Sequence, residues 1–210
     1  MIDMSNGNEP GVRRLQVVAE LGRLATAAQS CHACKLSKTR TNVVFARGNP
    51  QAELVFVGEG PGENEDTEGV PFVGASGKLL DKMIASIGYA RDDVYICNVV
   101  KCRPPGNRKP ETDEIAACRS YLEKQNALVA PRVIVALGTP ALQALVEPKE
   151  TIMEERGKWQ QYNGIRVMPT FHPAYLFRQP AAKKDAWLDM QAVAAALGKT
   201  IPPRTAEATR

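Results

Sequence analysis

Four short runs of β-branched and aliphatic residues, separated by stretches of helical periodicity, constrain the fold of this 210-residue chain more than any other feature. The runs lie at 53–58, 93–100, 133–137 and 165–171. Each run is apolar along its length, as expected of a strand that is buried on both faces of a parallel sheet. The pattern predicts an α/β fold, with a single three-layer domain around a central four-stranded parallel sheet.

Helical patterns separate these strands and flank them. They are expected at about 13–29, 73–88, 112–128, 140–146 and 183–197. We therefore expect one domain over residues 13–198, between a flexible N-terminus at 1–12 and a flexible tail at 199–210. The chain has no apolar run of about 18 residues and no apolar core of a secretory signal near its start, which predicts a cytoplasmic protein with no membrane partner.

Three of the predicted strands end in polar residues. Glu59 follows the first strand, Asn98 lies at the end of the second, and His172 follows the fourth. Parallel α/β sheets bind their ligands beyond the carboxyl ends of the strands, so these residues are candidates for one site. The glycine-rich turn at 58–62 lacks the spacing of a dinucleotide-binding loop, and the acidic residues that follow would repel a pyrophosphate. The turn instead suits a planar, weakly charged ligand.

The five cysteines favour metal ligation over disulfides, because a chain without an export signal is expected in a reducing compartment. Cys31 and Cys34 form a C-x-x-C pair, and Cys102 and Cys118 can form a second pair. Four such thiolates can hold zinc or an iron–sulfur cluster, and their spacing does not separate the two or exclude unrelated buried thiols. Cys97 lies inside an apolar run and is expected in the core.

Basic residues gather in three places, although the net charge is only +4. These places are 35–47, 101–109 and 178–184. If folding brings them to one face, they would form a surface that follows a phosphate backbone.

Several segments closely resemble family 4 uracil-DNA glycosylases. They are Gly58-Glu-Gly-Pro-Gly-Glu-Asn-Glu-Asp66, Pro71-Phe-Val-Gly74, Cys97-Asn-Val-Val-Lys-Cys-Arg-Pro-Pro105 and His172-Pro-Ala-Tyr-Leu-Phe-Arg178. The resemblance extends from about 31 to 197 and implies a uracil-DNA glycosylase-like fold. It also implies a structural [4Fe-4S] cluster, held by Cys31, Cys34, Cys102 and Cys118.

The activity that the resemblance implies is base-excision repair. A monofunctional enzyme of this family flips uracil out of single- or double-stranded DNA and hydrolyses its N-glycosidic bond, which leaves an abasic site. Phe72 would stack on the flipped base, Asn98 would hydrogen-bond its Watson–Crick edge, and His172 would donate to its O2. A cytosine would leave the amide mispaired, at a cost of roughly 1–3 kcal/mol, so Asn98 is the predicted specificity residue.

The group that activates the water is less clear from the resemblance. Gly60 and Gly62 occupy positions where better-known members of the wider superfamily carry an aspartate and a bulky aromatic residue. We predict that Glu59 and Glu65 take over these catalytic roles, with Glu59 near the base or the water and Glu65 crowding the C5 edge. Gly60 and Pro61 are also expected at the base. The predicted DNA contacts are Arg103, Arg108, Leu176, as the wedge that fills the vacated space, and Arg178.

Two other functions fit the same residues. The chain could be a non-catalytic iron–sulfur DNA-binding module, or a zinc-stabilised nucleotide-binding α/β protein. A monomer is expected in each case, because no predicted helix has a sustained coiled-coil seam.

Overall fold

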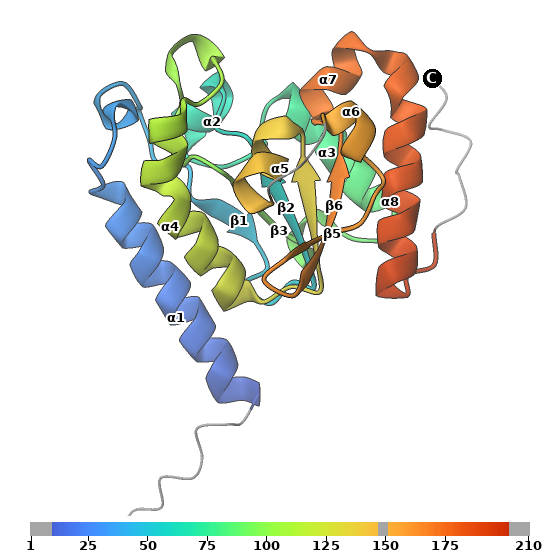
Figure 1. Cartoon of the computed structure of the whole chain (residues 1–210). Coiled ribbons are helices and arrows are strands. Elements are labelled where there is room, and N and C mark those ends of the chain that lie inside the picture. The colour runs from blue at the N-terminus through green and yellow to red at the C-terminus, as the bar shows by residue number, and fades with distance from the viewer. Residues whose placement is uncertain (1–9, 147–150, 202–210) are drawn as a thin grey trace, which may run out of the picture.

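A mixed six-stranded sheet forms the centre of the protein (Figure 1). The computed structural model describes residues 10–146 and 151–201, and its strands lie in the order β1-β3-β2-β4-β6-β5. The strands are β1 (Ala46–Gly48), β2 (Leu54–Gly58), β3 (Tyr95–Asn98), β4 (Val133–Leu137), β5 (Gln160–Tyr162) and β6 (Ile165–Thr170).

The predicted four-stranded parallel sheet is correct only for the middle of this sheet. The neighbours β3, β2, β4 and β6 are parallel, but β1 and β5 add an antiparallel strand at each edge. Each edge strand has three residues and is at most partly buried. Strands this short and polar leave no apolar run in the sequence, which is why the prediction missed them.

Eight α-helices and four short 3-10 helices surround the sheet in the described part of the chain. The α-helices are α1 (Pro10–Gln29), α2 (Glu63–Glu68), α3 (Ala75–Ser86), α4 (Thr112–Val129), α5 (Thr139–Leu145), α6 (Ile152–Glu155), α7 (Pro173–Arg178) and α8 (Lys183–Leu197). The 3-10 helices are η1 (Lys35–Lys38), η2 (Arg91–Asp93), η3 (Pro105–Asn107) and η4 (Pro180–Ala182).

Ordered structure extends beyond the expected domain, 13–198, at both ends of the described chain. Helix α1 begins at Pro10, so residues 10–12 of the expected flexible N-terminus are helical, and proline suits the first helical turn because it lacks an N–H. Near the other end, Ile201 packs against the core. Residues 1–9 and 202–210, the rest of both expected flexible segments, lie outside the described residues.

The sheet has a buried core on each face, so helices cover it on both sides. Val55 and Val57 of β2 point to the face covered by α1, α4 and α5, whereas Leu54 and Phe56 point to the face covered by α3 and α8. All four side chains are fully buried, and burying each contributes roughly 1.5–3 kcal/mol. This two-sided burial explains the continuous apolar run in the sequence.

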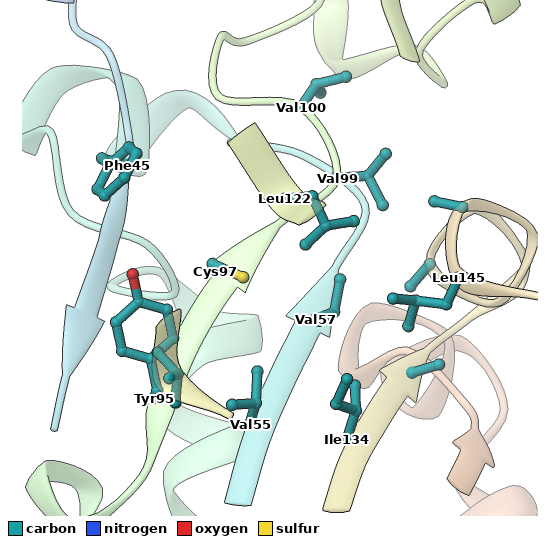
Figure 2. Close-up of a cluster of buried hydrophobic side chains, with 14 of the residues drawn as sticks. Phe45, Val55, Val57, Tyr95, Cys97, Val99, Val100, Leu122, Ile134 and Leu145 are labelled. Carbon is teal, nitrogen blue, oxygen red and sulfur yellow. The ribbon is translucent and has the colours of Figure 1, made fainter. Parts of the chain in front are cut away.

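Figure 2 shows the first of these cores. Side chains from β2, β3 and β4 meet Leu122 of α4 and Leu145 of α5 there. Cys97 lies among them and is fully buried, as predicted.

The carboxyl ends of the four parallel strands all lie at the same end of the sheet, close to α2, α5 and α7 (Figure 1). Glu59 directly follows β2, Asn98 ends β3, and His172 lies two residues beyond β6. The fold therefore brings the three predicted strand-end residues to the same edge. Among the described residues, no helix has the length and apolar character needed to cross a membrane.

Candidate active site and cysteine site

A cavity of about 430 Å³ opens at the carboxyl edge of the parallel strands. Pockets of this size hold small ligands such as a nucleobase. The residues predicted to bind uracil all line it: Glu59, Gly60, Pro61, Phe72, Asn98 and His172. The cavity is also lined by residues to which the sequence assigned no individual role, among them Ser76 of α3 and Tyr175 of α7, and by Lys109 of the predicted basic cluster at 101–109.

Phe72 and Asn98 approach each other across Gly58, the last residue of β2. A Cβ atom at position 58 would lie 2.4 Å from Asn98 Oδ1 and 2.6 Å from the Phe72 ring. Asn98 is only 1% exposed, and its Oδ1 accepts no hydrogen bond from the described residues. A buried acceptor without a partner costs roughly 1–3 kcal/mol. This oxygen is therefore available to an N–H group of a ligand in the cavity.

The backbone of Phe72 is held in an unusual conformation. Its φ is 55°, in the left-handed region that bulky residues rarely adopt. Arg91 donates to the carbonyls of Phe72 and Pro71 and pairs with Asp81 of α3. Gly77 leaves room for this turn, since a Cβ there would lie 1.8 Å from the Phe72 carbonyl oxygen. The surrounding contacts thus fix the ring, as is common for strained residues at functional sites.

His172 is the residue at the N-terminal cap of α7. Its Nδ1 accepts a hydrogen bond of 3.1 Å from the backbone N–H of Ala174, so the proton of the neutral ring lies on Nε2. Burial, together with the charge of Arg178, lowers the pKa of His172 to about 4. The ring is therefore neutral at pH 7. It offers Nε2–H as a donor in the cavity, with its ring centre 5.8 Å from that of Phe72.

Glu59 is partly buried in the wall of the same cavity. Burial raises the pKa of this carboxyl group above its ordinary value, and the nearby charge of Lys109 opposes the shift. A carboxylate whose pKa is raised binds a proton more readily than an exposed one does. Glu59 can therefore accept a proton from a water molecule or orient it.

Glu65 lines the cavity, but its carboxylate is occupied by backbone groups. Its Oε2 accepts from the N–H of Gly62 at 3.1 Å, and its Oε1 accepts from the N–H groups of Val73 and Gly74 at 2.9 and 2.8 Å. These bonds join the glycine-rich turn to the segment that follows Phe72. They suit a residue that holds the two loops together, rather than the catalytic group that the sequence predicted.

The predicted DNA-binding arginines have different surroundings. Arg108 lines the cavity, but it pairs with the buried Glu114 through two hydrogen bonds of 2.8 and 2.7 Å. Arg103 is not among the residues that line the cavity, and it donates to Asn107 at 2.7 Å. Arg178 is exposed at the cavity rim and forms no ion pair with the described residues. Of the three, Arg178 is the most available to a phosphate.

Leu176 cannot act as a wedge in this conformation. Its side chain is 1% exposed and packs in the core between the sheet and the helices α3 and α8. The next residue of the same helix, Phe177, is 50% exposed. Successive residues of a helix point about 100° apart, so only one of the two can face the core.

The four predicted cysteine ligands line a second, smaller cavity. Cys31 and Cys34 follow α1, Cys102 follows β3, and Cys118 lies in α4. Arg40 donates to Cys102 Sγ at 3.2 Å. Within 10–146 and 151–201, no three His, Cys, Asp or Glu side chains are grouped closely enough to hold a single metal ion. The four thiols therefore line a common cavity, but they do not converge on the position of a single metal ion.

Comparisons with known proteins agree with this architecture. The model of the uracil DNA glycosylase superfamily matches residues 45–192. A type-4 uracil-DNA glycosylase of Thermotoga maritima is 51% identical over 152 residues, which cover 71% of this chain and 79% of the relative. A type-4 enzyme of Saccharolobus solfataricus is 45% identical over 186 residues, or 84% and 86% of the two chains. One of Archaeoglobus fulgidus is 43% identical over 181 residues, or 82% and 91%. The chain belongs to the uracil DNA glycosylase superfamily and, within it, to the type-4 uracil-DNA glycosylases.

Proposed function

We propose that the cavity at the carboxyl edge of the sheet binds a uracil flipped out of DNA, and that its lining residues catalyse hydrolysis of the N-glycosidic bond. The family defines the enzyme class, a uracil-DNA glycosylase of base-excision repair. The observation that carries the residue assignment is the buried Oδ1 of Asn98, which lacks a partner among the described residues. Uracil N3–H would donate to this oxygen, and uracil O4 would accept from the amide nitrogen. Cytosine presents the opposite pattern and would be rejected.

The rings of Phe72 and His172 have separate roles in this proposal. Phe72 stacks on the face of the base. His172 donates from Nε2 to uracil O2, where negative charge accumulates as the bond to the sugar breaks. A neutral donor suits this task, because it stabilises the departing anion without first having to lose or gain a proton.

Glu59 is the residue that we assign to the water. Replacing it with glutamine should lower kcat by about 10²-fold, because the amide cannot accept the proton of the attacking water. The wild-type rate should rise with pH through the pKa of Glu59, which burial places above 4.5, and Glu59→Gln should lose this step. Single-turnover rates between pH 4 and 8 measure both effects. Wild-type rates in the variant would remove Glu59 from the mechanism.

The cysteine cavity fits a [4Fe-4S] cluster held by Cys31, Cys34, Cys102 and Cys118. The fit rests on a donor set of four thiols around one cavity and on the guanidinium of Arg40, which donates to the sulfur of Cys102. Bound there, the cluster would serve as a structural cross-link between the segment after α1, the loop after β3 and helix α4. Iron and sulfide analysis distinguishes it from zinc.

The proposed substrate is uracil in single- or double-stranded DNA, and the proposed state is a cytoplasmic monomer. Arg178 is the predicted phosphate contact that remains available at the cavity rim. Lys109 adds a further positive charge to the cavity wall. Positive groups of this kind position the DNA backbone and do not read the base.

Excision from a defined oligonucleotide tests this function. Anaerobically purified, cluster-loaded protein is incubated with a labelled strand that carries one uracil, and alkali then cleaves any abasic site. We expect cleavage at uracil and none at cytosine or thymine in matched strands. Asn98→Ala should lower the cleavage rate strongly, to a level that long single-turnover incubations still measure, while DNA binding persists. If the wild-type protein binds the strand without cleaving it, the non-catalytic DNA-binding module becomes the better description.

A further inference from the structure

Lys101 lines the cysteine cavity and also contacts the backbone of a residue in the wall of the larger cavity. Its side chain is only 2% exposed, and it lines the cysteine cavity beside Cys102 and Cys118. Its Nζ turns back along the chain and donates to the backbone carbonyl of Asn98 at 2.6 Å. A single side chain thus contacts the residue that recognises uracil and the wall of the cluster site.

The charge of Lys101 has no carboxylate partner in the described part of the chain. None of the ion pairs there involves it, and its Nζ lies over the ring of Phe45, 5.9 Å from the ring centre. A buried ammonium group is unfavourable unless an opposite charge lies nearby. The cysteine cavity is where that charge would come from, because four thiolates give a bound cluster a net negative charge. The Lys101 backbone N–H also interacts with the sulfur of Cys118.

We propose that Lys101 is a positioning residue that couples the cluster site to uracil recognition. The negative cluster holds the ammonium group in its buried place, and the ammonium group holds the carbonyl of Asn98 at the end of β3. The Asn98 amide is thereby fixed in the cavity at the carboxyl ends of the parallel strands, the uracil cavity. This inference rests on the proposed function. The inference adds to the proposed function that the cluster site affects base recognition through the side chain of Lys101.

A coupling of this kind is reciprocal. If the cluster favours the conformation of Asn98 that binds uracil, then a bound uracil must favour retention of the cluster by the same factor. The proposal therefore makes a prediction that does not depend on catalysis, namely that the occupied uracil cavity slows the loss of the cluster.

The first test is a double-mutant cycle between Lys101 and Asn98. Lys101→Met keeps the length of the side chain but removes its charge and donor, and it should lower kcat/KM for uracil about tenfold or more. Lys101→Arg should restore most of the activity. In an Asn98→Ala background, Lys101→Met should cost less than about threefold, because the group that it positions is gone. An equal cost in both backgrounds would show that Lys101 supports only the fold.

The second test follows the visible absorbance of the cluster during exposure to a chelator. The probe is a duplex with one 2′-fluorinated deoxyuridine, whose glycosidic bond resists cleavage. The duplex should slow cluster loss in the wild type and in Lys124→Met, a control at an exposed lysine of α4, but not in Lys101→Met. If Lys101→Met does not fold, Lys101→Gln replaces it. Equal protection of all variants would overturn the coupling, whereas failure of the wild type to excise uracil would instead overturn the proposed function.

Discussion

Replacing His172 with alanine should lower kcat by about 10²–10³-fold, with little effect on DNA binding. The loss of one preorganised donor to a developing anion has an effect of this size. The ring is held in place by the bond from Ala174 N–H to Nδ1, which leaves Nε2–H as its donor. Single-turnover excision measures the change, and His32→Ala, at the other histidine of the chain, is the matched control because His32 is exposed and does not line the uracil cavity.

A neutral His172 has consequences that an imidazolium would not have. Because its pKa is lowered to about 4, the rate should not decline as pH rises through 6.5, where an ordinary histidine loses its charge. His172→Gln, which keeps a neutral N–H, should recover part of the activity that alanine loses. A rate that falls above pH 6.5 in the wild type but not in His172→Gln would contradict the neutral donor.

The same shift predicts how stability depends on pH. The folded protein binds a proton at His172 less readily than the unfolded chain does, since the pKa is about 4 when folded and close to 6.5 when unfolded. The stability that comes from keeping His172 neutral is therefore fully present above pH 6.5. As the pH falls from 6.5 towards 4, the unfolded chain takes up a proton at His172 and the free energy of unfolding decreases. Urea denaturation measures the free energy of unfolding of the wild type and of His172→Ala at pH 7 and pH 4.5. The decrease between pH 7 and pH 4.5 should be smaller in the variant.

The sequence predicted which residues meet at the cavity in those cases where the position of a residue depends on a single strand. Glu59, Asn98 and His172 are polar residues at the ends of apolar runs, and parallel strands bring such ends together. For the cysteines, the C-x-x-C spacing indicates Cys31 and Cys34, whereas the choice of Cys102 and Cys118 as their partners also depended on the family resemblance.

Features that depend on how elements pack were not predictable. Leu176 and Phe177 are both apolar, and only the docking of α7 decides that the first enters the core. Arg91 holds Phe72 from 19 residues further along the chain, through backbone carbonyls that no side-chain pattern reveals. The buried partner of Arg108 likewise becomes visible only when helix α4 is placed beside the proline-rich loop.

The substitution Gly58→Ala should lower kcat/KM by about 10³-fold or more, although it adds a single methyl group. That group would lie 2.4 Å from Asn98 Oδ1 and 2.6 Å from the Phe72 ring, so the amide and the ring must both move. A displacement of about 1 Å of one such group can cost about 10²-fold, and two groups move here. The cost in stability should be smaller in proportion, at about 1–3 kcal/mol, which is typical of overpacking.

Gly22→Ala is the matched control for this experiment. Gly22 lies in α1, and a Cβ there would meet no atom within 4 Å, so alanine should leave excision unchanged and stabilise the helix by up to about 1 kcal/mol. Comparing kcat/KM and urea denaturation for both variants separates damage to the site from damage to the fold. Near wild-type excision by Gly58→Ala would mean that Asn98 and Phe72 do not act together on the base. If Gly58→Ala loses activity without a matching loss of stability, β2 remains folded. The loss then comes from displacement of Asn98 and Phe72 in the uracil cavity.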